Sequence, residues 1–188
     1  MNTQKGEITY KIQRLIVRLL ATNPAGNHLC MIGGFRYQFL DESARRSQDV
    51  DYHWEGDLDR KQKELISLFE RKLIPEVMKS CGYDGTIFPA SGPDGDSPFV
   101  KIVKTAFFQP NVADSRIEIP VEITRIVCLD EPIVRTVDGV VYLSVSDADM
   151  IESKVICLFN RLWIGWRVFI DIFLFQNQLR TRLNLAER

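Results

Sequence analysis

The sequence predicts an α+β fold, in which a mixed or antiparallel sheet is flanked by helices, for one domain spanning residues 1–188. Apolar residues at helical spacing predict an amphipathic helix at the start of the chain and further helices at its end. Between them the sequence predicts several strands joined by short turns. This order does not suit a doubly wound dinucleotide-binding fold, and the sequence has neither a G-x-G-x-x-G nor a P-loop motif. We expect a core over about residues 25–145 and two C-terminal helices over about 147–180.

The first half of the chain alternates between helices and short strands. Apolar residues at helical spacing predict an amphipathic helix over about residues 7–21, closed by the turn sequence NPAGN. The segment HLCMI is typical of a short buried strand that ends at a glycine pair, and residues 35–41 can form the following helix. DVDYHW alternates as a strand does. A second amphipathic helix covers about residues 57–80, where Pro75 should kink or restart it.

Strands dominate the second half. Residues 81–98 are rich in glycine, proline and aspartate, which indicates turns around one short strand. FVKIVKTAFF and SRIEIPVEITRIV predict two strands joined by the turn QPNVAD, and GVVYLSV predicts a further strand. Helical patterns then cover about residues 147–163 and 166–179, separated at Gly165.

The composition excludes several classes of protein. With 45% hydrophobic residues and a net charge of -1, the chain can bury a core but has no basic excess for coating nucleic acid. The chain has four cysteines, none in a C-x-x-C pair, and two histidines, and their spacing is not that of zinc ligands. No signal-peptide run opens the chain, and Arg161, Arg167 and Asp171 interrupt its most apolar stretch, so we expect a cytoplasmic protein with no membrane partner.

One stretch, MIGGFRYQFLDESARRSQDVDYHW, joins a glycine pair to two aspartates on a predicted strand. Asp49 and Asp51 point to the same side, with β-carbons roughly 7 Å apart, and a divalent cation between them would relieve their repulsion. Gly33 and Gly34 stand between a strand and a helix, which leaves backbone N–H groups free for phosphate. Each feature alone is common in turns and solvated strands. Together they favour a site for a triphosphate with Mg²⁺ or Mn²⁺.

A third carboxylate can come from the segment RIEIPVEIT. Glu118 and Glu122 alternate with β-branched residues, so both lie on the polar face of this strand. Either one can serve as a metal ligand or as the general base for an attacking hydroxyl. Pro120 between them indicates an edge position or a bulge.

These motifs resemble those of the DNA polymerase β nucleotidyltransferase superfamily, and most closely its AbiEii-type branch of toxins from bacterial toxin–antitoxin and phage-abortive systems. That branch reads Gly-Gly-Thr-Ala-Leu and then Arg-x-Ser/Thr-x-Asp-Ile/Leu-Asp, which RRSQDVD matches closely. ESKVICLFNRLWIGWRVFIDIF is similar to a later block of the branch, in which a helical Glu-Lys and an arginine precede Arg-Asp-x-x-Asp. Phe35 and Val168 depart from the pattern, because they replace a small residue and an acid.

The resemblance implies transfer of a nucleoside monophosphate from an NTP to a hydroxyl acceptor, with release of pyrophosphate. It implies an RNA, such as a tRNA, or a protein as acceptor, and a cognate antitoxin as partner. It also implies a role for each candidate residue. Asp49, Asp51 and Glu118 would hold the metal, with Glu122 as the reserve catalytic carboxylate, while Gly33, Gly34 and Ser47 would contact phosphates and Lys154 would meet the triphosphate.

Two other functions remain open from the sequence. One is a catalytically inactive relative that binds a nucleotide or a partner on the same fold, and the other is a structural subunit that pairs through its aromatic C-terminal helices. Ordinary interpretations are favoured for the remaining polar residues. His53 is expected to be a polar neighbour of the aspartates, Lys101 and Lys104 to lie on a solvated strand face, and Arg161, Arg167 and Asp171 to be structural.

Overall fold

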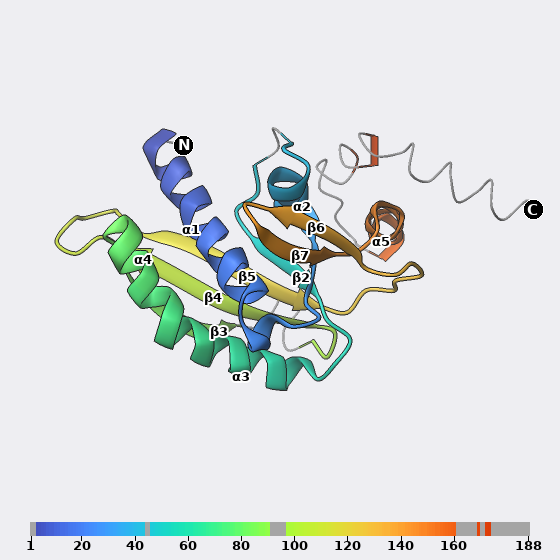
Figure 1. The fold of residues 1–188 in the computed structure, drawn as a ribbon, viewed down its shortest axis with the longest axis horizontal. Coiled ribbons are helices and arrows are strands. Elements are labelled where there is room, and N and C mark those ends of the chain that lie inside the picture. The colour runs from blue at the N-terminus through green and yellow to red at the C-terminus, as the bar shows by residue number, and fades with distance from the viewer. Residues whose placement is uncertain (1–2, 44–45, 91–96, 161–168, 170–171, 174–188) are drawn as a thin grey trace, which may run out of the picture.

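The computed structural model describes residues 3–43, 46–90, 97–160, 169 and 172–173. Their strands form one mixed sheet of seven, in the order β3-β4-β5-β2-β1-β7-β6 (Figure 1). The α+β fold predicted from the sequence is therefore present. The elements are α1 (Thr3–Ala21), η1 (Pro24–Gly26), β1 (Cys30–Ile32), α2 (Gly33–Leu40), β2 (Val50–His53), α3 (Leu58–Leu68), η2 (Phe69–Leu73), α4 (Ile74–Cys81), β3 (Asp84–Ala90), β4 (Val100–Phe108), β5 (Ile117–Thr124), β6 (Ile133–Val137), β7 (Val140–Ser144) and α5 (Asp147–Asn160).

The helices divide the sheet into two faces. In Figure 1, α1, α3 and α4 lie together on one face, and the main apolar core is packed between them and the sheet. Their buried stripes have helical spacing, as in Ile12, Ile16 and Leu20 of α1. A smaller core on the opposite face joins β1 to α2 and α5 through Ile32, Tyr37 and other residues. None of the helices in the described part of the chain is both long and apolar enough to span a membrane.

The helix predicted over residues 57–80 is interrupted in the middle. The side chain of Asp57 caps α3 by accepting a hydrogen bond from the backbone N–H of Arg60. A π-helical turn, η2, then separates α3 from α4. Pro75 lies in the first turn of α4, directly after η2, so the change in helix type falls beside the proline that was expected to kink or restart the helix.

Pro120 lies in a central strand without the expected bulge, at a position where β5 has a partner strand on one side only. β5 pairs with β4 in an unbroken antiparallel register on one side and with β2 in parallel on the other. The parallel pairing begins only at Val121, opposite Val50. The missing N–H of Pro120 therefore leaves no gap in the ladder with β2.

The C-terminal half holds one strand that the sequence patterns did not predict. β6 forms a hairpin with β7 across Asp138 and Gly139, which both have positive φ (49° and 73°), as a two-residue type I′ turn requires. α5 matches the first of the two predicted C-terminal helices. The second, over residues 166–179, lies almost wholly outside the described residues, as do Arg161, Arg167, Val168 and Asp171.

Candidate functional site

The Asp51 side chain lies against Gly33, at the point where β1 passes into α2. The antiparallel pairing of β1 with β2 sets Ile32 opposite Asp51. Gly33 has a φ of +73°, and a β-carbon built there would be 1.8 Å from Oδ2 of Asp51. Only a residue without a side chain leaves room for this carboxylate. The glycine turn and the second aspartate thus meet at the N-terminus of α2, where the helix dipole favours negative charge.

Glu122 is the carboxylate that the sheet brings beside Asp51. The parallel register of β2 and β5 makes the two residues direct neighbours, so their side chains leave the same face of the sheet. Both side chains are half-buried. Glu118 lies four residues earlier in β5, before the start of β2, and its Oε1 accepts a hydrogen bond from Nε of Arg116 at 2.7 Å. The geometry therefore favours Glu122 over Glu118 as the third carboxylate.

Two glutamines hold the segment that carries Ser47 and Asp49. Nε2 of Gln13, a residue of α1 that is 1% exposed, donates to the backbone oxygens of Ser47 and Asp49, at 3.1 and 3.4 Å. The backbone N–H of Ser47 donates to Oε1 of Gln38 at 3.1 Å. The Ser47 hydroxyl donates in turn to Oδ1 of Asp49. Sequence reasoning missed both glutamines, although Gln13 is a polar residue on the otherwise apolar stripe of α1.

Arg36 was also missed, and it ties α2 to the elements that follow the sheet. Its guanidinium is fully buried, donates to Oγ of Ser144 at 2.9 Å and to the Asp41 carboxylate at 2.6 Å, and lies 2.5 Å from Oδ1 of Asp147. Burial raises the pKa of Asp41, and the charge of Arg36 partly offsets that rise. Asp147 is the first residue of α5, the helix on which Lys154 lies half-buried.

The two strand lysines occupy different environments. Lys101 is 8% exposed, and its Nζ lies 3.0 Å from the Asp59 carboxylate of α3, so the expectation of a solvated position is wrong for this residue. Lys104 is half-buried and pairs with Pro120 on the same sheet face as Glu122. Lys104 is therefore the one of the two that lies on the face of the candidate site.

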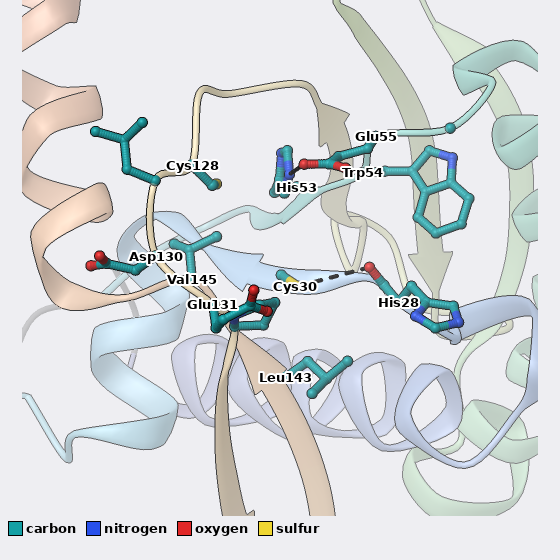
Figure 2. Close-up of a pocket in the computed structure, with 13 residues that line it drawn as sticks. His28, Cys30, His53, Trp54, Glu55, Cys128, Asp130, Glu131, Leu143 and Val145 are labelled. Atoms are coloured by element: carbon teal, nitrogen blue, oxygen red, sulfur yellow. Dashed lines mark hydrogen bonds and ion pairs between the residues drawn. The ribbon is translucent and has the colours of Figure 1, made fainter.

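A cavity of about 550 Å³ opens at the end of β2, on the same side of the sheet as Asp51. Its floor includes Cys30, Cys128, Leu143 and Val145 (Figure 2). Burial, with a smaller contribution from Glu55, raises the pKa of Cys30 to about 11, and burial with nearby acidic groups raises that of Cys128 to about 12. Both thiols are thus neutral near pH 7 and contribute apolar surface.

His53 presents a hydrogen-bond donor to this cavity. The side chain is nine-tenths buried, and its Nδ1 accepts a hydrogen bond from the backbone N–H of Ile126 at 3.2 Å. A neutral imidazole with an accepting Nδ1 carries its proton on Nε2. Nε2 lies 3.6 Å from Oε1 of Glu55, longer than a hydrogen bond. His53 is therefore placed to donate to a ligand and not to act as a base.

The oxygen-rich set around Asp51 suits a magnesium ion that is shared with a substrate. No three His, Cys, Asp or Glu side chains within the described ranges lie close enough to hold a metal by themselves. Mg²⁺ in phosphoryl-transfer sites usually takes one or two carboxylates and completes its shell with water and phosphate oxygens. Asp51 with Asp49 or Glu122 fits that use, and does not fit a dedicated metal site.

Comparison with solved structures identifies the fold. A proposed nucleotidyltransferase from H. pylori superposes with a TM-score of 0.61 at 16% identity, over 92% of this chain and 68% of that one. JHP933 from Helicobacter pylori gives 0.59 at 16% identity, over 92% and 66%. MenT4, a nucleotidyltransferase toxin from Mycobacterium tuberculosis H37Rv, gives 0.54 at 15% identity, over 80% and 52%.

The chain thus has a nucleotidyltransferase fold and spans about two thirds of the H. pylori proteins and about half of MenT4. No family profile and no curated protein matches the sequence. The fold class expected from the sequence is confirmed. Because the identities are low, the likeness extends to the fold and not to the AbiEii-type branch.

Proposed function

We propose that this protein is a metal-dependent nucleotidyltransferase that transfers a nucleoside monophosphate from an NTP to a hydroxyl acceptor. The contact between Asp51 and Gly33 carries the proposal, because it sets a carboxylate at the start of a helix whose N–H groups can receive a triphosphate. Glu122, beside Asp51 in the sheet, adds a second acid at the same point. The nucleotidyltransferase fold of the chain supports this assignment.

Each candidate residue has a role that its position allows. Gly33 and Gly34 receive the phosphates at the start of α2, and Ser47 orients the Asp49 carboxylate through its hydrogen bond. Asp49 and Asp51 would hold Mg²⁺ or Mn²⁺, which would neutralise charge on the triphosphate. Lys154, on α5, adds a positive charge for the triphosphate, as the motif resemblance implies.

The reaction is an in-line displacement at the α-phosphorus. The acceptor hydroxyl loses its proton to the Glu122 carboxylate as its oxygen bonds to the α-phosphorus. The bond between the α-phosphorus and the α–β bridging oxygen breaks, and pyrophosphate leaves with the electron pair. Glu118 is the weaker candidate for the proton acceptor, because it is paired with Arg116 and lies before the start of β2.

The acceptor and the biological role belong to the same proposal. An RNA such as a tRNA, or a protein, supplies the hydroxyl, and the activity serves as the toxin of a toxin–antitoxin pair that a cognate antitoxin neutralises. This part is supported by the motif resemblance and by the fold likeness to MenT4. Induced expression should then arrest bacterial growth, and the Asp51→Asn variant should not.

Radiolabel transfer tests the chemistry directly. The purified protein is incubated with Mg²⁺, total RNA and each α-labelled NTP in turn. We expect labelling by the wild type, none by Asp51→Asn, and a loss of at least 100-fold in Glu122→Gln, the scale of a missing general base. Circular dichroism confirms that the variants are folded. Labelling by Asp51→Asn at the wild-type rate would rule out the proposed site, and a greater loss in Glu118→Gln than in Glu122→Gln would reverse the assignment of the third carboxylate.

A further inference from the structure

Arg36 lies about one helical turn after the glycine pair and joins α2 to three other parts of the fold. Its guanidinium is fully buried, and each of its three nitrogens has a different partner. Nε donates to Oγ of Ser144 at the end of β7, Nη1 donates to the Asp41 carboxylate directly after α2, and Nη2 lies 2.5 Å from Oδ1 of Asp147. The Ser144 hydroxyl in turn lies 3.3 Å from the carbonyl oxygen of Met31 in β1. Arg36 therefore fixes the start of α5 relative to the strand and the helix that flank the glycine turn.

A guanidinium suits three partners that lie in different directions. Its nitrogens form a rigid planar fork, and this plane lies over the ring of Tyr37, with Cζ 5.0 Å from the ring centroid. Arg36→Lys would keep a positive charge near Asp41 and Asp147, but a compact ammonium on a flexible stem does not fix the direction of each contact. Orientation is therefore what the arginine adds to the charge.

Lys154 lies on the face of α5 that begins with Asp147. Asp147, Met150, Ile151 and Lys154 follow the i, i+3, i+4, i+7 spacing of one helix face. Met150 and Ile151 are 1% and 0% exposed, so this face packs against the rest of the protein, and Lys154 is half-buried on it. Lys154 follows Asp147 by about 10 Å along the helix axis. The ion pair at the start of α5 therefore sets both the direction and the axial position of the Lys154 side chain.

We propose that Arg36 is a positioning residue that holds Lys154 in place for the triphosphate. The buried guanidinium anchors the first turn of α5 to α2, and α5 directs the Lys154 ammonium toward the phosphates that Gly33 and Gly34 receive. Arg36 itself touches no substrate, because its side chain is fully buried. This role rests on the proposed function, which supplies the place of the triphosphate and the task of Lys154.

Inorganic tripolyphosphate with Mg²⁺ tests this role without a base or an acceptor. Titration calorimetry compares the wild type with Arg36→Lys, Lys154→Met and the double variant, after urea unfolding has shown that each is folded. Lys154→Met should weaken binding about 10-fold or more, the scale of a hydrogen bond between charged groups. Arg36→Lys should lose most of the same factor. The two losses should not multiply in the double variant, because a displaced Lys154 contributes little binding that its removal could abolish.

Lys101→Met is a matched control for the loss of a buried cation. Lys101 is 8% exposed, and its Nζ lies 3.0 Å from the Asp59 carboxylate. It pairs with Ile123, next to Glu122, and so lies on the sheet face opposite the candidate site. Lys101→Met should lower the free energy of unfolding and keep the wild-type affinity for tripolyphosphate.

The outcomes separate the role of Arg36 from the function on which it rests. Unchanged affinity in Arg36→Lys or in Lys154→Met, losses that multiply in the double variant, or an equal loss in Lys101→Met would each overturn the positioning role and leave the nucleotidyltransferase assignment standing. If the wild type binds neither tripolyphosphate nor any of the four NTPs with Mg²⁺, both fall. If Arg36→Lys is unfolded, Asp147→Asn takes its place in the comparison, because it weakens the same ion pair from the side of α5.

Discussion

Replacing Gly33 with alanine would put a methyl group into the space that the Asp51 carboxylate occupies. The left-handed backbone at Gly33, with φ of +73°, costs an alanine about 1–2 kcal/mol. The new β-carbon would also lie 1.8 Å from Oδ2 of Asp51, so the carboxylate must leave its rotamer at a cost of about 0.5–1.5 kcal/mol. We expect the free energy of unfolding to fall by about 1.5–3.5 kcal/mol.

Gly82 provides a matched control for this substitution. It has the same φ of +73°, but a β-carbon built there meets nothing within 4 Å. Gly82→Ala should therefore cost only the backbone contribution of about 1–2 kcal/mol. Urea unfolding measures both variants, and calorimetry with Mg²⁺ and an NTP should show loss of binding in Gly33→Ala alone. Equal stability losses with unchanged NTP binding in both variants would refute the placement of Asp51 over the glycine turn.

Three further changes probe the surroundings of the site. Gln13→Met keeps the side-chain volume but removes both hydrogen bonds to the segment before β2. This change should lower the free energy of unfolding by about 1–3 kcal/mol, measured by urea unfolding. It should also weaken Mg²⁺–NTP binding, measured by calorimetry. Arg36→Met should lower the free energy of unfolding by about 3–5 kcal/mol, because it leaves the partly buried carboxylates of Asp41 and Asp147 without their cation. A loss below about 1 kcal/mol in urea unfolding would show that these ion pairs do not stabilise the fold. Burial raises the pKa of the Cys30 and Cys128 thiols to about 11 and 12, so their thiolate fractions stay small at pH 8. Iodoacetamide should therefore modify both thiols far more slowly in the folded protein than in urea. The rate of modification in the folded protein should rise as the pH approaches 11. Mass spectrometry of the peptides would measure that rate, and equal labelling in both states would contradict the buried floor of the cavity.

Local patterns were enough to predict the glycine turn and the strand that carries Asp51, because a strand, a turn, a helix and an adjacent strand lie within one short stretch, while Asp49 lies just before that strand. The choice between Glu118 and Glu122 was beyond such patterns. Alternation shows that both face the same side, but the register of β5 against β2 depends on residues far apart in the chain. The parallel pairing of Asp51 with Glu122 is therefore visible only in the fold.

Two other misses have the same kind of cause. β6 is short, with half-buried and exposed residues in alternation, and its best local signal was the Asp138–Gly139 turn that joins it to β7. Gln13 lies in a helix that was predicted from its apolar residues alone, so this polar residue was given no role. Its two hydrogen-bond acceptors lie more than thirty residues later, so nothing near it in the sequence indicates its task.

The pairing of β2 with β5 also bears on how the candidate site forms. About 70 residues separate Asp51 from Glu122, and contacts between such distant parts of a chain form late and slowly in folding. A nascent polypeptide cannot bring these acids together before β5 has left the ribosome. An interrupted translation product that ends before β5 would lack Glu122 and the strand pairing that sets this acid beside Asp51.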